Sequence, residues 1–389
     1  MKYLFWAGMV TVLYTYVGYP ACLWLRSRVR PKPVKRASCF PSVSVVMVVR
    51  NEEKILQHKL ANLTAQSYPA DRIEFIVVSD GSRDSTEQIL QQHALQDQRM
   101  RVIACADSRG KAAGLNDGIS RARGEIILFT DSRQEIEPDA LRLLMENFAD
   151  PAVGCASGEL MVGDPTTGEC KRGAGLYWSI EKKIRGLEAA SGSVVGVTGA
   201  LYAARRALLV AVPAGTILDD VYLPMHVVRQ GSRVVFDDRA RAWDALLGEK
   251  REFSRKVRTL SGNYQLLQLA PWLLGRANSI RFEFVSHKLM RLVVPLALVV
   301  IFLSSLLTGG LFFRAVLLLQ IGFYILSLVG ILGWAKRGWL ARAADAARTF
   351  MTLNTAAGLA FVNWIAGRKP AWMLAESEEP TRVEASEIR

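Results

Sequence analysis

The segments "VSVVMVV", residues 43–49, and "IEFIVVSD", residues 73–80, decide the fold class of this chain. Both are short runs of β-branched and aliphatic residues, which are typical of strands buried on both faces of a parallel sheet. Residues 51–66 lie between them and have apolar residues at helical spacing, with acidic residues in the first turn. A strand, a helix and a second strand in this order predict an α/β sheet whose strands are mostly parallel.

The alternation of strands and helices continues along the chain. We expect a third strand over 101–106, a fourth over 125–131, and a helix over 84–94 with Asp84 as its N-cap. The chain contains neither GxGxxG nor GxxxxGK[ST], so the sequence predicts neither a dinucleotide site nor a P-loop.

Charged residues gather where the predicted strands end. In open α/β sheets, ligands bind beyond the carboxyl ends of the strands. Glu52, Asp80 and Asp131 stand at the ends of the first, second and fourth strands, and Lys111 follows the third. A single acid at a strand end is more often a turn or helix cap than a ligand. Several acids beside a basic loop instead indicate a bound phosphate ester at this edge of the sheet.

The composition indicates a membrane protein rather than a nucleic-acid-binding one. Half of the 389 residues are hydrophobic, and the formal net charge is +13. Basic residues lie beside apolar runs, as in 26–36, and no zinc-finger, RRM-like or helix-turn-helix signature is present, so we expect no nucleic acid partner. The five cysteines are odd in number and form no CxxC pair, which argues against a disulfide framework or zinc site and fits a reducing cytoplasm.

Apolar segments at both ends predict several membrane spans. Residues 4–25 carry no charge and are long enough to cross about 30 Å of hydrocarbon. The basic residues of 26–36 then place the central domain on the cytoplasmic side, by the positive-inside rule.

The C-terminal region repeats this pattern. Segments 292–307 and 311–334 predict a helical hairpin that turns at the glycine pair between them. A weaker segment, 350–367, either crosses the bilayer or lies at its surface with Trp364 and Trp372 as anchors.

These observations divide the chain into six parts. We expect an N-terminal transmembrane helix (1–25), a basic linker (26–40), an α/β domain (41–248), interfacial helices (249–291), a C-terminal transmembrane region of two to three helices (292–367) and a tail (368–389) that is acidic and disordered from Glu376.

Five motifs extend the argument from fold to family. They are, in order, VSVVMVVRNEE (43–53), IVVSDGSRDST (76–86), RGKAAGLN (109–116), FTDSRQ (129–134) and TILDDVYLPMHVVRQGSRVVFDD (216–238). Together they resemble membrane-bound family 2 glycosyltransferases of the GT-A fold, a group that includes cellulose, chitin and hyaluronan synthase-like enzymes and bacterial exopolysaccharide transferases. The resemblance covers roughly 40–290.

The resemblance implies a nucleotide-sugar donor, usually a UDP-sugar, and inversion at the anomeric carbon. The acceptor would be a saccharide or a lipid-linked sugar, with the inner (plasma) membrane as location and polysaccharide export proteins as partners. By the motifs, Glu52 and Asp80 would hold the nucleotide base and Lys111 the pyrophosphate. Asp131 would be the first acid of the DxD motif and would face ribose or a metal ion.

The same resemblance assigns the catalytic residues. Asp220 matches the general base, and Asp219 stands where the family has glutamate. A positioned carboxylate that removes the proton of the attacking hydroxyl contributes on the order of 10²–10⁴ in rate. From the residues alone, either aspartate could instead cap the helix that follows. Residues 198–206 resemble the stretch that borders the acceptor pocket.

Two motifs depart from the family pattern. The DxD motif reads Asp131-Ser132-Arg133, so Mg²⁺ or Mn²⁺ would depend more on the donor diphosphate, and Arg133 could supply part of the positive charge. The QxxRW motif reads "EFSRK" (252–256), in which Arg255 is retained and lysine replaces tryptophan. The loss of that tryptophan weakens the case for long-chain processive synthesis. Arg255 would close over the diphosphate or, alternatively, contact anionic lipid headgroups.

Two further functions stay open. The first is a polyprenyl-phosphate sugar transferase, although such relatives lack the long region after the base motif. The second is a catalytically inactive GT-A subunit that scaffolds a synthase complex, which the altered DxD motif would explain. Residues 177–185 resemble an acceptor-side helix with Glu181 as a sugar contact, or form an amphipathic helix that only packs.

Overall fold

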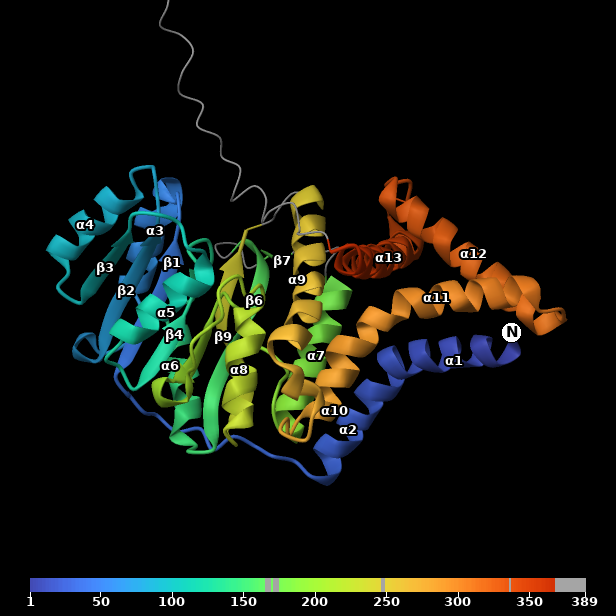
Figure 1. Cartoon of the computed structure of the whole chain (residues 1–389), viewed down its shortest axis with the longest axis horizontal. Helices are drawn as coiled ribbons and strands as arrows, with labels where there is room; N and C mark the ends of the chain where they lie inside the picture. Colours follow the sequence, from blue (N-terminus) through green and yellow to red (C-terminus); the bar gives the residue numbers. More distant parts are fainter. Residues whose placement is uncertain (165–168, 171–174, 246–248, 336, 368–389) are drawn as a thin grey trace, which may run out of the picture.

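The computed structural model describes residues 1–164, 169–170, 175–245, 249–335 and 337–367. Its strands are β1 Val43–Val49, β2 Ile73–Asp80, β3 Met100–Cys105, β4 Ile126–Phe129, β5 Glu135–Ile136, β6 Val153–Asp164, β7 Glu169–Cys170, β8 Tyr202–Arg205 and β9 Arg233–Asp244. Its α-helices are α1 Lys2–Leu13, α2 Tyr19–Val29, α3 Glu53–Thr64, α4 Thr86–Gln96, α5 Lys111–Arg121, α6 Ala140–Met145, α7 Gly175–Ser191, α8 Asp219–Arg229, α9 Glu249–Leu269, α10 Arg281–Phe284, α11 Met290–Leu307, α12 Leu311–Ile331 and α13 Gly338–Ile365. The predicted α/β alternation is confirmed (Figure 1).

One twisted sheet organises the central domain. Its strand order is β3-β2-β1-β4-β8-β6-β9-β5, with β7 paired to β6. The four strands from β3 to β4 are parallel, as predicted, whereas β8 runs antiparallel to both β4 and β6. The chain leaves β1 toward β2 and β3 on one side and later adds β4 on the other. The carboxyl ends of β1 and β4 therefore border the crevice where ligands bind in such sheets.

Both faces of the sheet are buried, which explains the continuous apolar runs. Val46 on β1 faces the core that includes α5, α8 and α9, while Val45 faces the opposite core beneath α3 and α6. The fourth strand ends at Phe129, two residues earlier than predicted, so Asp131 lies in the loop. The N-cap of α4 is Ser85 rather than Asp84, whose carboxylate accepts hydrogen bonds from the backbone N–H groups of Thr86 and Glu53.

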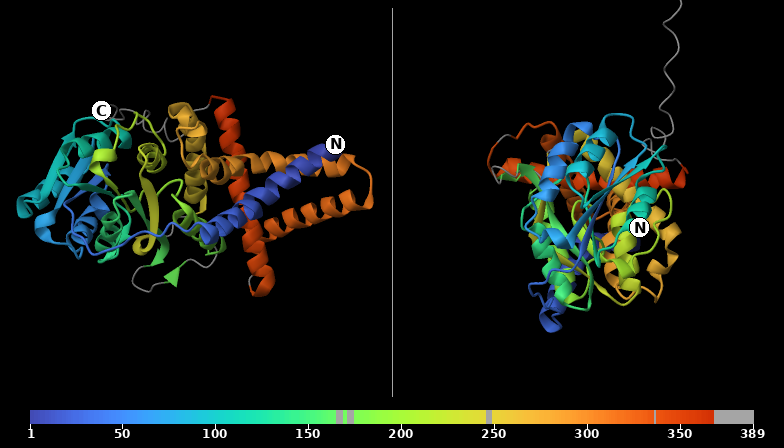
Figure 2. Two further views of the ribbon diagram at one scale, coloured as in Figure 1. Left: turned by 90° about the horizontal axis from the view of Figure 1, so that it is seen from below. Right: turned by 90° about the vertical axis from the view of Figure 1, so that its left-hand side faces the viewer.

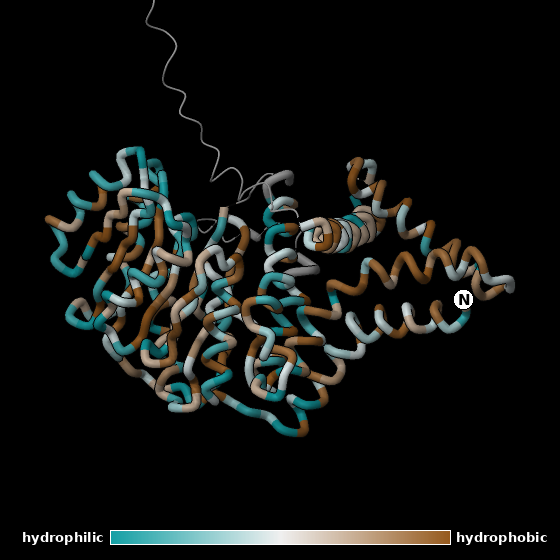
Figure 3. The backbone as a smooth tube through the Cα atoms, in the orientation of Figure 1, coloured by the Kyte–Doolittle hydropathy of each residue, from teal (hydrophilic) through white to brown (hydrophobic). Residues whose placement is uncertain are grey.

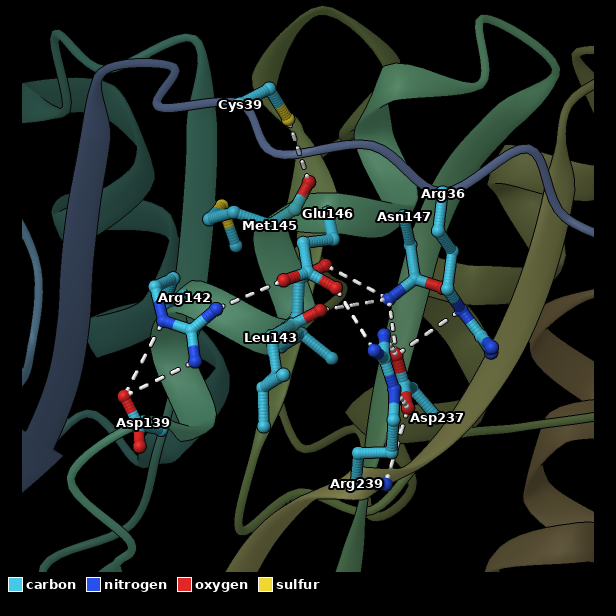
Figure 4. Close-up of polar contacts among 11 residues, drawn as sticks. Arg36, Cys39, Asp139, Arg142, Leu143, Met145, Glu146, Asn147, Asp237 and Arg239 are labelled. Carbon is cyan, nitrogen blue, oxygen red and sulfur yellow. Dashed lines mark hydrogen bonds and ion pairs between the residues drawn. The ribbon is translucent and has the colours of Figure 1, made fainter.

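The linker predicted over 26–40 lies against the domain. Helix α2 continues to Val29, and the non-helical chain that follows runs along the base of the sheet (Figure 1). Arg36 donates from Nε to Asn147 Oδ1 at 3.0 Å and lies 3.4 Å from the buried carboxylate of Asp237 (Figure 4). The Cys39 thiol donates to the Met145 carbonyl at 3.1 Å. These contacts tie the N-terminal helix to the domain through a bound strap, residues 30–42.

Three helical segments are long and apolar enough to cross a membrane: Lys2–Val29, Arg281–Leu307 and Leu311–Ile331. The first contains α1 and α2, and the second contains α10 and α11. Helices α1, α11 and α12 extend away from the domain and carry large hydrophobic residues that are exposed, and the hydropathy colouring along α11 and α12 is mostly hydrophobic (Figure 3). The predicted hairpin turn lies between α11 and α12, where Gly310 has φ of +121°, a conformation that glycine adopts without strain.

Residues 350–365 of the weaker C-terminal segment form the last part of α13, which is not among the three candidates. Helix α13 runs across α11 and α12 instead of alongside them (Figure 2). Trp364 near its end stacks on Tyr264 of α9, with ring centroids 5.1 Å apart. The second predicted anchor, Trp372, and the tail from 368 lie outside the described residues. The six-part division of the chain remains a prediction.

Candidate active site

Lys111 brings two of the predicted acidic residues together. It is the first residue of α5, and its Nζ lies 2.9 Å from Asp131 Oδ1 in the loop after β4. The same Nζ lies 3.6 Å from Asp219 Oδ2 at the start of α8. Burial would lower the pKa of Lys111, but the carboxylates of Asp131 and Asp219 outweigh it and raise that pKa above its usual value. Lys111 therefore carries a full positive charge between two acids.

Asp219 and Asp220 occupy the first turn of α8, where the helix dipole favours negative charge. Gly199 marks the space that Asp220 shares with Asp131. A Cβ atom built on Gly199 would lie 3.8 Å from Asp131 Oδ2 and 3.8 Å from Asp220 Oδ2. The two carboxylates thus face one small space beside a glycine, in the stretch 198–206 that was expected to border the acceptor pocket.

Asp220 and Asp131 have different pKa values because their surroundings differ. Burial and the neighbouring charge of Asp219 raise the pKa of Asp220 to about 6, although Lys111, Lys288 and Arg185 oppose the shift. For Asp131, burial is outweighed by Lys111, which lowers the pKa below its ordinary value. Asp131 is therefore a permanent anion near neutral pH, while Asp220 is a stronger base than an ordinary carboxylate.

Asp80 holds the loop that leads into Lys111. Its buried carboxylate accepts hydrogen bonds from the backbone N–H groups of Arg109 at 2.7 Å and Gly110 at 2.9 Å, and from the Ser108 hydroxyl at 2.8 Å. Gly81, next to Asp80, has φ of +65°, and a Cβ there would lie 2.4 Å from the Ser108 nitrogen. The structure thus gives Asp80 a positioning contact, and its role toward a nucleotide base stays a prediction.

Glu52 connects the loops after β1 and β4. Its Oε1 accepts a hydrogen bond from the Ser132 hydroxyl at 2.8 Å, so it lies beside the middle residue of the altered DxD motif. Arg133 is exposed, and its charge helps to lower the pKa of Asp131, after the larger effect of Lys111. Arg255 instead donates from Nη1 to Asp244 Oδ2 at 3.1 Å, near the end of β9. The described contacts of Arg255 do not join it to the group formed by Lys111, Asp131, Asp219 and Asp220, called the Lys111 cluster below.

The sequence reasoning missed Lys59, which lies beneath the Asp131 loop. Its side chain is buried, and its Nζ donates to Thr130 Oγ1 at 3.0 Å and to the Gln134 carbonyl at 2.6 Å. Burial lowers the pKa of Lys59 to about 7. Lys59 is three residues after Leu56, so the helical spacing alone places it on the apolar face of α3 and could have predicted its burial.

Tyr202 was also missed, although it lies within residues 198–206, which resemble the border of the acceptor pocket. Its ring stacks on Phe129, with centroids 4.6 Å apart, and its buried hydroxyl has no hydrogen-bond partner among the described residues. Burial, and then the charge of Asp219, raise the pKa of Tyr202 well above its usual value. A buried hydroxyl without a partner is costly, so the Tyr202 hydroxyl is a candidate substrate contact.

Glu181 faces the membrane helices rather than the Lys111 cluster. Its buried carboxylate lies 3.1 Å from His287 Nε2 and accepts a hydrogen bond from Arg291 Nη1 at 2.8 Å. These contacts favour the packing interpretation of the helix that contains it. Lys288 follows His287 and lies close to the Asp220 backbone. A Cβ atom built on Gly196 would be 3.8 Å from Lys288 Nζ and 3.6 Å from the Asp220 carbonyl oxygen.

The cluster can accommodate a metal ion only with help from a ligand. Among the described residues, no three His, Cys, Asp or Glu side chains gather to hold one. Asp131 Oδ1 is occupied by Lys111, and its Oδ2 accepts no hydrogen bond within the described part of the chain. This donor set fits a divalent cation that the oxygens of a bound diphosphate coordinate for the most part. A separate cavity of about 490 Å³ lies beside β3 and α5. Its lining includes Cys105, Arg109 and Asp117 but not Asp131, Asp219 or Asp220.

The sheet and the loop cluster at its carboxyl edge define a GT-A fold. The solved structure of mannosyltransferase PcManGT from Pyrobaculum calidifontis, in complex with GDP-Man and Mn²⁺, matches with a TM-score of 0.72 at 22% identity. The match covers 94% of this chain and 100% of that chain, so the fold extends to the flanking helices.

The sequence comparisons name the family. Residues 44–211 match the profile of Glycosyl transferase family 2, so the chain carries a family 2 glycosyltransferase domain, as its five motifs predicted. The Beta-monoglucosyldiacylglycerol synthase of Synechocystis sp. is 26% identical over 172 residues, which are 43% of this chain and 36% of that protein. The Poly-beta-1,6-N-acetyl-D-glucosamine synthase of Staphylococcus aureus is 22% identical over 249 residues, which are 62% of this chain and 60% of that protein. The chain spans less than two thirds of either relative.

Proposed function

We propose that this chain is a membrane-bound, inverting glycosyltransferase that moves a sugar from a nucleotide-sugar donor to a saccharide or lipid-linked acceptor. The observation that carries the proposal is the cluster in which Lys111 lies between Asp131 and Asp219, with Asp220 beside them. The similarity to a polysaccharide synthase supports a place in extracellular polysaccharide synthesis. The resemblance favours a UDP-sugar donor, a cytoplasmic catalytic domain on the inner (plasma) membrane, and export proteins as partners.

Asp220 is suited to start the reaction. We expect its carboxylate to take the proton of the acceptor hydroxyl while the oxygen attacks the anomeric carbon. The new glycosidic bond forms as the bond to the diphosphate oxygen breaks, and the configuration inverts because attack and departure take place on opposite faces of the sugar. The raised pKa of Asp220, about 6, leaves it mostly ionised at neutral pH yet more basic than a surface carboxylate.

Lys111 and Arg133 are suited to receive the leaving group. The diphosphate gains negative charge as it departs, and cationic side chains stabilise that charge. Asp131 would hold Mg²⁺ or Mn²⁺ together with the donor, and a bound cation would neutralise part of the diphosphate charge. We expect Glu52 to support this loop through Ser132. Arg255 would have to leave Asp244 to reach a diphosphate.

Donor hydrolysis and transfer by the full chain, purified in detergent, test this proposal. A panel of UDP-sugars with Mg²⁺ or Mn²⁺ should yield UDP, and Asp220→Asn should reduce transfer by roughly 10²–10⁴ while nucleotide binding is kept. Asp139→Asn is the matched control, because that carboxylate is exposed and belongs to the N-cap residue just before α6. If Asp220→Asn leaves turnover intact, the base assignment is wrong. If none of these UDP-sugars releases UDP with either metal ion, the inactive scaffold subunit becomes the better interpretation.

The acceptor defines a second candidate function. The similarity to a protein named as a glucosyldiacylglycerol synthase supports a lipid acceptor as an alternative to a growing saccharide. Mass spectrometry of the product formed from one defined donor and a mixture of diacylglycerol, polyprenyl phosphate and oligosaccharide acceptors separates these cases. A product on polyprenyl phosphate alone would favour the polyprenyl-phosphate transferase.

A further inference from the structure

A second cavity lies at the base of the membrane helices, and its lining contains none of Lys111, Asp131, Asp219 and Asp220. It has a volume of about 670 Å³, and Tyr14, Arg276, Arg281, Phe282, Ser286 and Met290 line it. Tyr14 belongs to the N-terminal helix, whereas the other residues come from the loop before α10 and from the start of the second candidate span. The Tyr14 hydroxyl and the Ser286 hydroxyl lie 2.6 Å apart, which joins the two walls.

The polar wall of this cavity carries two guanidinium groups. Arg276 and Arg281 are exposed, and neither forms an ion pair with any described residue. Arginine can present two N–H groups to one phosphate, so a pair of free guanidinium groups at a cavity favours a phosphate ester. The neighbouring Glu283 does not neutralise them, because it is buried and paired with Arg26.

The apolar wall leads onto the surface of the membrane helix. Phe282 is 45% exposed, and Val293 and Leu296 of α11 remain 43% and 59% exposed farther along the same segment. Arg281 is the first residue of the candidate span Arg281–Leu307. The cavity therefore lies where α2 and α10, packed against the domain, give way to α1 and α11, which extend from it (Figure 1). Basic and aromatic residues at such a boundary match the headgroup region of a bilayer.

We propose that this cavity binds the phosphodiester headgroup of an anionic bilayer lipid, with its acyl chains along α11. Arg276 and Arg281 hold the phosphate, Tyr14 and Ser286 offer hydroxyl groups, and Phe282 and Met290 contact the first methylene groups. A net anionic headgroup binds better than phosphatidylcholine, whose choline cation offsets the phosphate charge. None of Lys111, Asp131, Asp219 and Asp220 lines this cavity, so the proposal does not depend on the proposed glycosyltransfer.

Native mass spectrometry of the full chain in detergent tests the site with phosphatidylglycerol as the probe. We expect one adduct that binds more tightly than the phosphatidylcholine adduct. The double variant Arg276→Ala/Arg281→Ala should weaken it by about tenfold or more, since each arginine contributes a charge-assisted contact. Both side chains are exposed, so the variant should keep its thermal unfolding midpoint.

The matched control is Arg28→Ala/Arg30→Ala, which removes the same charge from exposed residues outside the cavity. It should keep the adduct. Equal loss in both double variants would overturn the proposal, because the binding would then be diffuse electrostatic attraction. Equal affinity for phosphatidylcholine would also overturn it. A further arm uses sn-glycerol 3-phosphate, and displacement of the lipid at equal concentration would show a site for free phosphate esters instead.

Discussion

Lys111 Nζ lies 2.9 Å from Asp131 Oδ1, and this contact joins the first residue of α5 to the loop after β4. The position of Lys111 depends on Asp80. The Asp80 carboxylate accepts hydrogen bonds from the backbone N–H groups of Arg109 and Gly110, the two residues before Lys111. Asp80 thus fixes the loop that leads into Lys111, and the Lys111 ammonium group contacts Asp131. This arrangement keeps a cation at the carboxyl edge of the sheet even without a ligand.

Replacement of Lys111 should weaken donor binding more than it harms the fold. In Lys111→Met, the diphosphate loses a charge-assisted contact, and Asp131 and Asp219 repel it, so we expect nucleotide affinity to fall by roughly tenfold to a hundredfold. Isothermal titration with UDP measures the change. Lys182→Met is the control, because Lys182 pairs with Glu159 and is 39% exposed, close to the 38% of Lys111. Unchanged affinity would remove Lys111 from the site.

The pH dependence of turnover should follow Asp220. Its pKa of about 6 predicts that kcat/KM rises as pH increases through 6 and then levels off, because the base must be ionised. Lys288 lowers that pKa, so Lys288→Met should shift the acidic limb to higher pH. A surface variant, Lys183→Met, should leave the limb in place. An acidic limb near pH 4 would contradict this assignment.

The same shift has a consequence for stability. A carboxyl group whose folded pKa lies above its unfolded value stabilises the fold below the unfolded pKa, and this contribution is lost as pH rises through the folded pKa. Asp220→Asn should therefore raise the free energy of unfolding at pH 7 relative to the parent chain, and less so at pH 4. Chemical denaturation at the two pH values measures it. An equal effect at both would mean that Asp220 titrates normally.

Gly199 should tolerate a methyl group structurally but not functionally. A Cβ at this position meets Asp131 and Asp220 at 3.8 Å, an ordinary contact distance, so Gly199→Ala should fold. The methyl group would fill the space between the two carboxylates, and we expect kcat/KM to fall by about tenfold or more. Gly186→Ala on α7 is the control, because nothing lies within 4 Å of its Cβ position and it should leave kcat/KM unchanged. Equal activity of both variants would place the reaction elsewhere.

The strap should contribute to stability through Asp237. This fully buried carboxylate accepts hydrogen bonds from Asn147 at 2.8 Å and Arg239 at 2.8 Å and lies near Arg36 of the strap (Figure 4). Asp237→Ala removes the shared partner of all three side chains and should cost about 1–3 kcal/mol in the free energy of unfolding. The control is Asp238→Ala. The Asp238 side chain is 56% exposed, so this variant should lower the free energy of unfolding much less. Equal melting temperatures would show that the strap adds little.

Much of the fold could be predicted from local patterns. The apolar runs 43–49 and 73–80 required strands buried on both sides, and the uncharged run 4–25 required an apolar surrounding. Motif order then indicated the GT-A fold and the glycosyltransferase family. Each of these inferences rests on a few consecutive residues, whose burial is a property of their own side chains.

Other features depended on distant contacts. The approach of Lys111 to Asp219, the burial of Lys59 beneath the Asp131 loop and the pairing of Arg255 with Asp244 all join segments separated in the chain. The binding of the linker as a strap belongs with them. The sequence by itself determined the first four strands, the helices between them and the apolar segments, because those depend on local side-chain pattern. Only the tertiary structure decided which charges meet, because that depends on the strand order and on how the loops pack at the carboxyl edge of the sheet.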